Sequence, residues 1–154
     1  MNYDVWGSWS PTVGPNAPLD DSCAAAANQQ GSAVSAVKAW TTAGFPCNQI
    51  ILSVAAYGHS FFVEKSKALD SSGNILTNAT FDKSKQPAGD AWDQTAVGKD
   101  VCGNQNVVGG IFTFWGLIDA GFLQCDGFVT NGIQYAFDSC SRTVCAHMPY
   151  VVTH

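Results

Sequence analysis

The chain contains little charge and almost no glutamate. Charged residues make up 12% of its 154 residues, the formal net charge is -5, and Glu64 is its one glutamate. This acidic balance repels polyanions, so we expect no nucleic-acid partner and no anionic membrane surface as a partner. A neutral polymer is the better expectation.

The sequence also lacks long apolar runs. It has no stretch long enough to span a bilayer, and the segment 1–9 has neither the basic start nor the apolar run of a signal peptide. A segment upstream is therefore expected. Hydrophobic residues nevertheless make up 46% of the chain, which is enough to bury one ordinary core. One domain, with room for an attached lobe, is the starting expectation.

The cysteines show no C-x-x-C spacing, and with the three histidines they form no recognisable zinc pattern. We therefore expect no metal site and no cofactor, and we expect the cysteines to form disulfides. The sequon Asn78-Ala79-Thr80 predicts N-glycosylation at Asn78. Both features agree with a secreted or extracellular protein. The six cysteines are Cys23, Cys47, Cys102, Cys125, Cys140 and Cys145.

The first part of the chain has the pattern of a βαβ unit. Apolar residues at helical spacing, a capping serine at position 32, and Gly44 followed by Pro46 predict a helix over 32–43. The apolar run over 49–57 predicts a strand covered on both faces, as in a parallel sheet. With a short opening strand over 1–5, these elements form strand, helix and strand.

The second part has the pattern of a small α+β lobe. Segments 61–64 and 75–81 flank a turn over 70–74 and predict an antiparallel hairpin. Helical spacing and strand-like alternation follow. The helical set is Phe112, Trp115, Ile118 and Phe122; the alternating set is Ile133, Tyr135 and Phe137. The expected fold class is α/β, with a partial (β/α) barrel piece over 1–61 and an α+β lobe with its tail over 62–154.

Three ordered stretches resemble fungal-type, class V chitinases of glycoside hydrolase family 18. They are Met1–Gly7; Gly31–Trp40 with Ala56–Phe61; and Asp100–Gly103 with Phe114–Ile118 and Phe137–Ser141. The resemblance implies a C-terminal-side fragment. It would hold the sixth and seventh strands of an eight-stranded barrel and part of the lobe inserted after them. It would stop before the eighth strand and its tryptophan, and the tail after Thr143 departs from the family's sequence.

The resemblance also implies a sugar-binding site. In this family the tyrosine and aspartate of M-x-Y-D hydrogen-bond the N-acetyl group of the sugar, which implies these roles for Tyr3 and Asp4. Tyr57 would lie near the same cleft, Met1 would pack beside it, and Trp6 would offer an aromatic face to a pyranose ring.

The catalytic acid that the family requires is missing. Family 18 catalysis uses a glutamate at the end of a D-x-x-D-x-D-x-E run, and Glu64 lies outside any such run, between Val63 and Lys65. We expect Glu64 to be solvated and we expect no catalytic residue in this chain.

Other candidate residues have simpler explanations. His59 and Ser60 invite a hydrolase interpretation, but neighbours on a strand point to opposite faces. Loop and cap roles are expected for the acidic pairs 20–21 and 90/93, and a core role for Phe112 and Trp115. The family's cysteine positions imply a disulfide between Cys102 and Cys140.

Three functions remain open. The first is a chitinase-like protein that binds chitin or N-acetylglucosamine oligosaccharides. The second is a fragment of an active chitinase that hydrolyses β-1,4-linked N-acetylglucosamine. The third is an interaction or defence protein that no longer binds sugar. Exposed strand edges would also permit a homo-oligomer.

Overall fold

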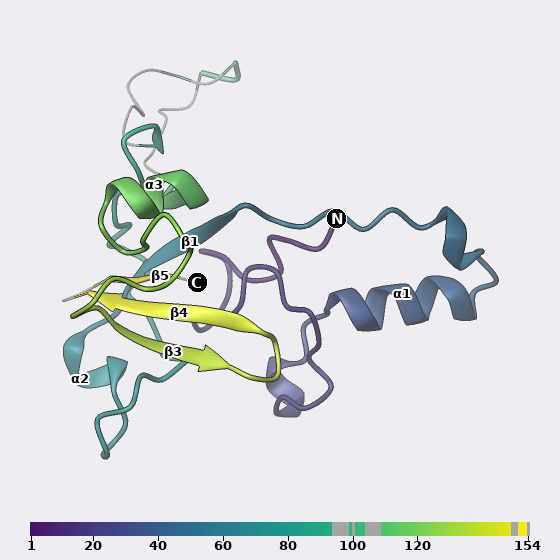
Figure 1. Cartoon of the computed structure of the whole chain (residues 1–154), viewed down its shortest axis with the longest axis horizontal. Coiled ribbons are helices and arrows are strands. Elements are labelled where there is room, and N and C mark those ends of the chain that lie inside the picture. Colours follow the sequence, from purple (N-terminus) through teal and green to yellow (C-terminus); the bar gives the residue numbers. More distant parts are fainter. Residues whose placement is uncertain (94–98, 100, 104–108, 149–150, 154) are drawn as a thin grey trace.

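A five-stranded antiparallel sheet forms the centre of the computed structural model, which describes residues 1–93, 99, 101–103, 109–148 and 151–153 (Figure 1). The strand order is β2-β1-β5-β4-β3. The strands are β1 (Tyr57–Phe62), β2 (Ile111–Thr113), β3 (Gln134–Asp138), β4 (Thr143–Met148) and β5 (Val151–Thr153). The segment after Thr143, expected to be a divergent tail, therefore supplies β4 and β5, two of the three central strands.

Each strand of the sheet pairs in a defined register. Tyr57 of β1 lies opposite Thr113 of β2, and on its other edge Phe61 lies opposite Val152 of β5. β3 pairs with β4, as Tyr135 opposite Ala146 shows. β1 thus runs across the boundary expected between residues 61 and 62.

Two hydrophobic clusters hold the sheet. Neighbouring side chains of β4 join different clusters, since Cys145 belongs to the first and Ala146 to the second. Successive strand residues point to opposite faces, so the clusters lie on the two sides of the sheet. The first contains Val13, Phe61, Val63, Ala68, Ala79 and Cys145; the second contains Phe112, Phe122 and Ala146.

The helix expected over 32–43 is confirmed as α1 (Ala33–Thr42). Its N-terminus is a capping box: the Ser32 hydroxyl accepts from the Ser35 backbone N–H, and the Ser35 hydroxyl accepts from the Ser32 backbone N–H. Gly44 ends it with a φ of 90°. Only Ala33 of this helix is buried, and Figure 1 shows α1 projecting away from the sheet. The short helices are η1 (Ala26–Asn28), η2 (Cys47–Gln49), α2 (Lys65–Ala68) and α3 (Phe114–Asp119).

The strands expected over 1–5 and 49–57 are largely absent. One parallel bridge, Asn2 to Val54, joins the two segments, and the Asn2 N–H donates to the Ser53 carbonyl over 3.1 Å. Its parallel direction is the one a βαβ unit requires. The expectation of a strand covered on both faces is wrong, because Ile51 is 90% exposed and no further strand of the described residues flanks this segment.

The expected hairpin over 61–64 and 75–81 is also wrong. The predicted turn at 70–74 forms, but it closes a single bridge between Leu69 and Ile75. Phe61 and Phe62 pair with β5 instead. β5 pairs with three residues of β1, whereas the bridge between Leu69 and Ile75 is a single pair. The apolar edge of β1 is therefore covered by the longer ladder.

The predictions of a helix over 112–122 and of a strand over 133–137 hold in part. The helical spacing marks α3, but Phe112 lies in β2 and Phe122 follows the helix. These two phenylalanines form the expected core, whereas Trp115 is 66% exposed and the core role expected for it is wrong. Tyr135 and Phe137 lie in β3 and Ile133 directly precedes it, but both aromatic side chains are more than half exposed, so the expected apolar face is the more exposed one.

Candidate functional site

Two side chains of β1 meet the carboxylate of Asp4, which comes from a distant part of the chain. The Tyr57 hydroxyl donates a 2.6 Å hydrogen bond to Asp4 Oδ1, and His59 Nε2 lies 3.0 Å from the same oxygen. Asp4 lies within the opening segment 1–5, whereas Tyr57 and His59 lie at the start of β1. We call Tyr3, Asp4, Tyr57, His59 and Trp9 the strand-end cluster.

Local backbone structure aims these groups at one another. Tyr57 and His59 are two positions apart on β1, so their side chains leave the same face of the sheet. Asp4 has a φ of 57°, a conformation that aspartate adopts more readily than most residues. Buried Asn16 holds it there, because its Oδ1 accepts from the Asp4 N–H over 2.9 Å and its Nδ2 donates to the Tyr57 carbonyl over 3.0 Å.

Aromatic rings continue the cluster on either side. The Tyr3 and Tyr57 rings lie 6.0 Å apart, and the Tyr57 and His59 rings 5.8 Å apart, both edge to face. The Trp9 ring lies 6.4 Å from that of His59 and is 61% exposed. A small cavity of about 120 Å³ opens beside Trp9. It is lined by Ser8, Trp9, His59, Ser60, Phe61, Gln86 and Gly109.

The hydrogen bonds keep the carboxylate ionised and the phenol protonated. Partial burial opposes ionisation of Asp4, but the hydrogen bonds from Tyr57 and His59 outweigh it and lower the pKa of Asp4 below 3.8. Burial and the neighbouring Asp4 carboxylate raise the pKa of Tyr57 well above 10.0. Asp4 is therefore a hydrogen-bond acceptor at neutral pH, and Tyr57 is a donor.

Three of the five predicted sugar-site residues are brought together by the fold. These are Tyr3, Asp4 and Tyr57. Met1 is 89% exposed, so it does not pack beside them as expected. Trp6 is only 2% exposed, and the expectation that it offers an open aromatic face is wrong. The segment after it folds back over the indole and buries it.

Three residues of this site were not predicted from the sequence: Trp9, Asn16 and His59. A signal for His59 was present, because it lies two positions beyond Tyr57 on a strand and must share its face. Its neighbour Ser60 points away and donates to the Gly110 carbonyl over 2.9 Å. No sequence signal distinguishes Trp9 from Trp6, because only tertiary packing decides which of the two indoles is exposed.

Glu64 and Asp21, two acidic residues outside the strand-end cluster, have structural roles. Glu64 is exposed, precedes α2 and lies 3.7 Å from the Lys67 ammonium, so its predicted solvated position is confirmed. Asp21 has the expected cap role, since it accepts from the Gly31 N–H and the Ser32 hydroxyl at 2.8 Å each. Within the described residues, no group of histidine, cysteine and acidic side chains has the arrangement of a metal site.

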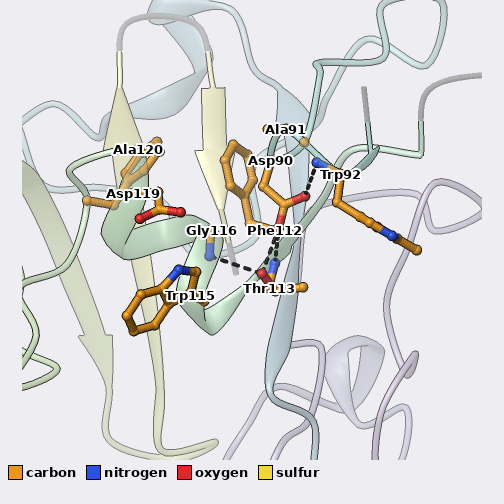
Figure 2. Close-up of a pocket in the computed structure, with 11 residues that line it drawn as sticks. Asp90, Ala91, Trp92, Phe112, Thr113, Trp115, Gly116, Asp119 and Ala120 are labelled. Atoms are coloured by element: carbon orange, nitrogen blue, oxygen red, sulfur yellow. Dashed lines mark hydrogen bonds between the residues drawn. The ribbon is translucent and has the colours of Figure 1, made fainter. Parts of the chain in front are cut away.

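A larger cavity lies beside β2. It has a volume of about 490 Å³ and is lined by residues of the segment 89–92, β2 and α3. Figure 2 shows Asp90 at its edge, where its Oδ2 accepts from the Thr113 N–H over 3.0 Å and from the Thr113 hydroxyl over 2.7 Å. The same hydroxyl accepts from the Gly116 N–H, so Asp90 organises the start of α3. Asp90 has the loop role expected for it.

The expected disulfide between Cys102 and Cys140 is wrong, because Cys140 is bonded to Cys23. Their Cα atoms are 5.7 Å apart although 117 positions separate them. The Leu19 N–H donates to the Ser141 carbonyl over 2.9 Å, which brings the N-terminal loop beside the turn between β3 and β4. Asp100, quoted with Cys102 in the third motif, lies outside the described residues.

The Asn78 side chain is half-buried. Its Nδ2 donates to the Val13 carbonyl over 3.3 Å, and its Oδ1 accepts from Asn28 over 2.9 Å. Glycosylation at Asn78 stays a prediction, which an intact mass of the protein from its natural source would test. No helix among the described residues is long and apolar enough to cross a membrane.

Comparison with known proteins identifies relatives for nearly the whole chain. The model of glycosyl hydrolases family 18 matches residues 1–123. A chitinase-like effector of Moniliophthora roreri is 56% identical over 153 residues, which are 98% of this chain and 36% of that protein. A chitinase-like effector of Moniliophthora perniciosa is 52% identical over 146 residues, which are 94% of this chain and 33% of that protein. The chain thus spans about a third of each relative.

Solved structures show the same partial match. A chitinase of Rhizomucor miehei is 28% identical, with a TM-score of 0.78 over 99% of this chain and 40% of that one. A family 18 chitinase of Cycas revoluta in complex with (GlcNAc)4 is 18% identical, with a TM-score of 0.63 over 99% of this chain and 33% of that one. The second likeness supports the fold alone: the chain matches a piece of the barrel chitinases.

Proposed function

We propose that this chain, which belongs to glycosyl hydrolase family 18, is a chitinase-like protein whose strand-end cluster binds N-acetylglucosamine oligosaccharides without cleaving them. The family resemblance deduced from three sequence motifs is confirmed by the family match. The observation that supports the proposal is the convergence of Tyr57 and His59 on the Asp4 carboxylate beside an exposed tryptophan.

The cluster has the chemical groups that an N-acetylated sugar needs. A pyranose ring presents a flat C–H face, for which the exposed indole of Trp9 is a suitable platform. The acetamido group presents an N–H donor and a carbonyl acceptor. The ionised Asp4 carboxylate can accept from the former. The Tyr57 hydroxyl can donate to the latter once the sugar displaces its 2.6 Å hydrogen bond to Asp4, because a phenol has one proton to donate.

The same electrostatics argue against cleavage by this cluster. Breaking a glycosidic bond requires a carboxylic acid that is protonated near neutral pH and donates to the leaving oxygen. The pKa of Asp4 is lowered, so this carboxylate is in the wrong protonation state for that role. Glu64 is exposed, lies 3.7 Å from the Lys67 ammonium and is not part of the strand-end cluster.

Titration of (GlcNAc)4 into the purified chain tests this proposal. We expect saturable binding by calorimetry and tryptophan fluorescence, about tenfold weaker in Trp9→Ala and in Asp4→Asn. Trp40→Ala is the matched control, since Trp40 is equally exposed but lies on α1. Cellotetraose, which lacks acetamido groups, should bind much more weakly. Absence of saturable binding to (GlcNAc)4 would reject the proposed site.

A second candidate function is part of an active chitinase. Its support is that the chain spans about a third of its relatives, and the R. miehei neighbour is a chitinase. Intact mass of the natural protein separates the two, because a fragment of an active chitinase would be found as part of a longer chain. Hydrolysis of a chitobiose-type chromogenic reporter by this chain alone should stay at background in either case, and clear turnover would contradict the argument that it lacks a catalytic acid.

A further inference from the structure

The outer edge of β3 is the open edge of the sheet. β3 is last in the strand order, and within the part of the chain that the structure describes no strand pairs with its outer side. Figure 1 shows β3 at the border of the sheet, beyond β4. An edge strand turns alternate backbone N–H and C=O groups away from its neighbour, where another strand can pair with them. β3 therefore has the backbone geometry to accept a further strand.

The opposite edge of the sheet, formed by β2, is covered. The Ile111 carbonyl accepts from the Asp90 N–H over 2.9 Å. The Asp93 carboxylate accepts from the Ile111 N–H over 3.1 Å, and the Asp90 carboxylate accepts from the Thr113 N–H over 3.0 Å. The segment 90–93 thus satisfies backbone groups of β2, which leaves β3 as the edge at which the sheet can be extended.

Large apolar side chains line this edge on one face of the sheet. Tyr135 and Phe137 are two positions apart and share a face, and they are 56% and 52% exposed. Val144, 42% exposed, lies opposite Phe137 on β4, and buried Ala146 of the second hydrophobic cluster lies opposite Tyr135. The exposed side chains therefore continue outward from a hydrophobic core. We call Tyr135, Phe137 and Val144 the edge patch.

Little in β3 keeps this edge from pairing. Natural edge strands are blunted by lysine, proline or a bulge. The sequence Gln-Tyr-Ala-Phe-Asp contains no lysine or proline, and its residues pair with β4 one to one. Its one charged residue, Asp138, ends the strand and accepts from the Ser141 hydroxyl of the following turn over 2.6 Å. The edge is thus regular and apolar on one face.

The sequence of β3 is complementary to itself in the antiparallel direction. In a register centred on Ala136, Tyr135 lies opposite Phe137 of the second copy, and Gln134 lies opposite Asp138 of the second copy. Directly opposite residues share a face, so the aromatic side chains of both copies form one continuous strip. No like charges lie opposite each other, and the Gln134 amide can donate to the Asp138 carboxylate. This complementarity indicates a second copy of the chain as the partner.

We propose that two copies of this chain associate through the outer edges of β3, antiparallel and centred on Ala136, and join their five-stranded sheets into one continuous sheet. Both copies use the same edge, so the contact is isologous and closes at a dimer. Tyr135 and Phe137 become covered across the twofold axis. Each copy contributes one short strand, so the interface is small and the dimer should dissociate on dilution. Association does not depend on sugar binding, because β3 contributes no residue to the strand-end cluster.

Sedimentation equilibrium of the purified chain tests this association. We expect a monomer–dimer equilibrium whose dissociation constant rises at least about tenfold in the double variant Tyr135→Lys with Phe137→Lys, because lysines on an edge strand repel a second copy. Trp40→Lys is the matched control, since Trp40 is 59% exposed but lies on α1. Far-ultraviolet circular dichroism checks that each variant keeps the parent fold.

A cysteine placed on the twofold axis tests the register. Ala136→Cys is made together with Cys145→Ala, because Cys145 lies opposite Ala136 on β4 and would pair with the new thiol. We expect mild oxidation to link position 136 to the same position of the second copy, as mapped by mass spectrometry. Gln134→Cys in the same background should not link to itself, because that position faces Asp138 of the second copy.

Two outcomes would overturn the inference. One is a monomer at every concentration up to the limit of solubility, without a cross-link at position 136. The other is a dimer that Trp40→Lys dissociates and the double lysine variant leaves intact, which would assign association to the apolar side chains of α1. If the double lysine variant fails to fold, the cross-link at position 136 decides between these results.

Discussion

The indole of Trp6 packs directly on Gly14, so closely that a Cβ added to Gly14 would overlap the ring. This contact makes Trp6 a core residue, whereas Trp9, three positions later, is exposed. We expect Trp6→Ala to lower the free energy of unfolding by about 3–5 kcal/mol, as for other buried aromatic residues. Trp9→Ala should change it by less than about 0.5 kcal/mol, as is usual for a surface position.

Urea denaturation followed by circular dichroism measures both tryptophan variants. Gly14→Ala tests the contact from the other side, and we expect it to cost about 1–3 kcal/mol because the interior is overpacked. A Trp6→Ala variant as stable as the parent would show that this indole is not part of the core.

The titration of Asp4 should depend on Tyr57. The hydrogen bond from Tyr57 helps to hold the pKa of Asp4 below 3.8, so Tyr57→Phe should raise that pKa. Because the folded-state value is lowered, ionised Asp4 stabilises the fold above pH 3.8, and this contribution is lost as the pH falls through the folded-state pKa. As the pH is lowered, Tyr57→Phe should therefore lose the part of sugar binding that depends on ionised Asp4 at a higher pH than the parent does. Carbon NMR of the Asp4 carboxyl measures the shift, and an unchanged titration curve would contradict it.

The disulfide between Cys23 and Cys140 should stabilise the chain substantially. It joins residues 117 positions apart, and closing a loop of that size is worth about 4–5 kcal/mol in the chain-entropy model. The double variant Cys23→Ser with Cys140→Ser should therefore unfold at a markedly lower urea concentration. Cys125→Ser is the control, since this exposed thiol forms no disulfide. Tryptic mapping that links Cys140 to another cysteine would refute the pairing.

Buried Asp90 should stabilise the junction of β2 and α3. The hydroxyl and N–H of Thr113 hold the pKa of Asp90 below 3.8, so its stabilising effect is present above that pH and is lost on acidification. Asp90→Ala should cost about 1.5–3 kcal/mol, the usual range for hydrogen bonds to a charged group. Asp119→Ala, at an exposed position on the same cavity, should stay within about 0.5 kcal/mol. Equal effects of the two substitutions in urea denaturation would contradict this role.

Local signals in the sequence determined several parts of this protein. The Ser32 cap, the helical spacing and Gly44 define α1 because a helix satisfies its backbone hydrogen bonds within its own segment. The turn at 70–74 was found for the same local reason, since its hydrogen bonds join Asp70 to Gly73 and Asn74. Three ordered motifs, M-x-Y-D among them, identified the family, because motifs are recognised from residue types and need no coordinates.

Only the tertiary structure decided which distant segments meet. Local periodicity does not specify the partners for strand pairing, burial or disulfide pairing. β1 pairs with β5 and not with 75–81, and Cys140 bonds Cys23 and not Cys102. The apolar run over 49–57 was expected to form a strand covered on both faces, and the described residues supply no such cover. The sequence therefore determined what each segment requires, and the fold determined which requirements are met within this chain.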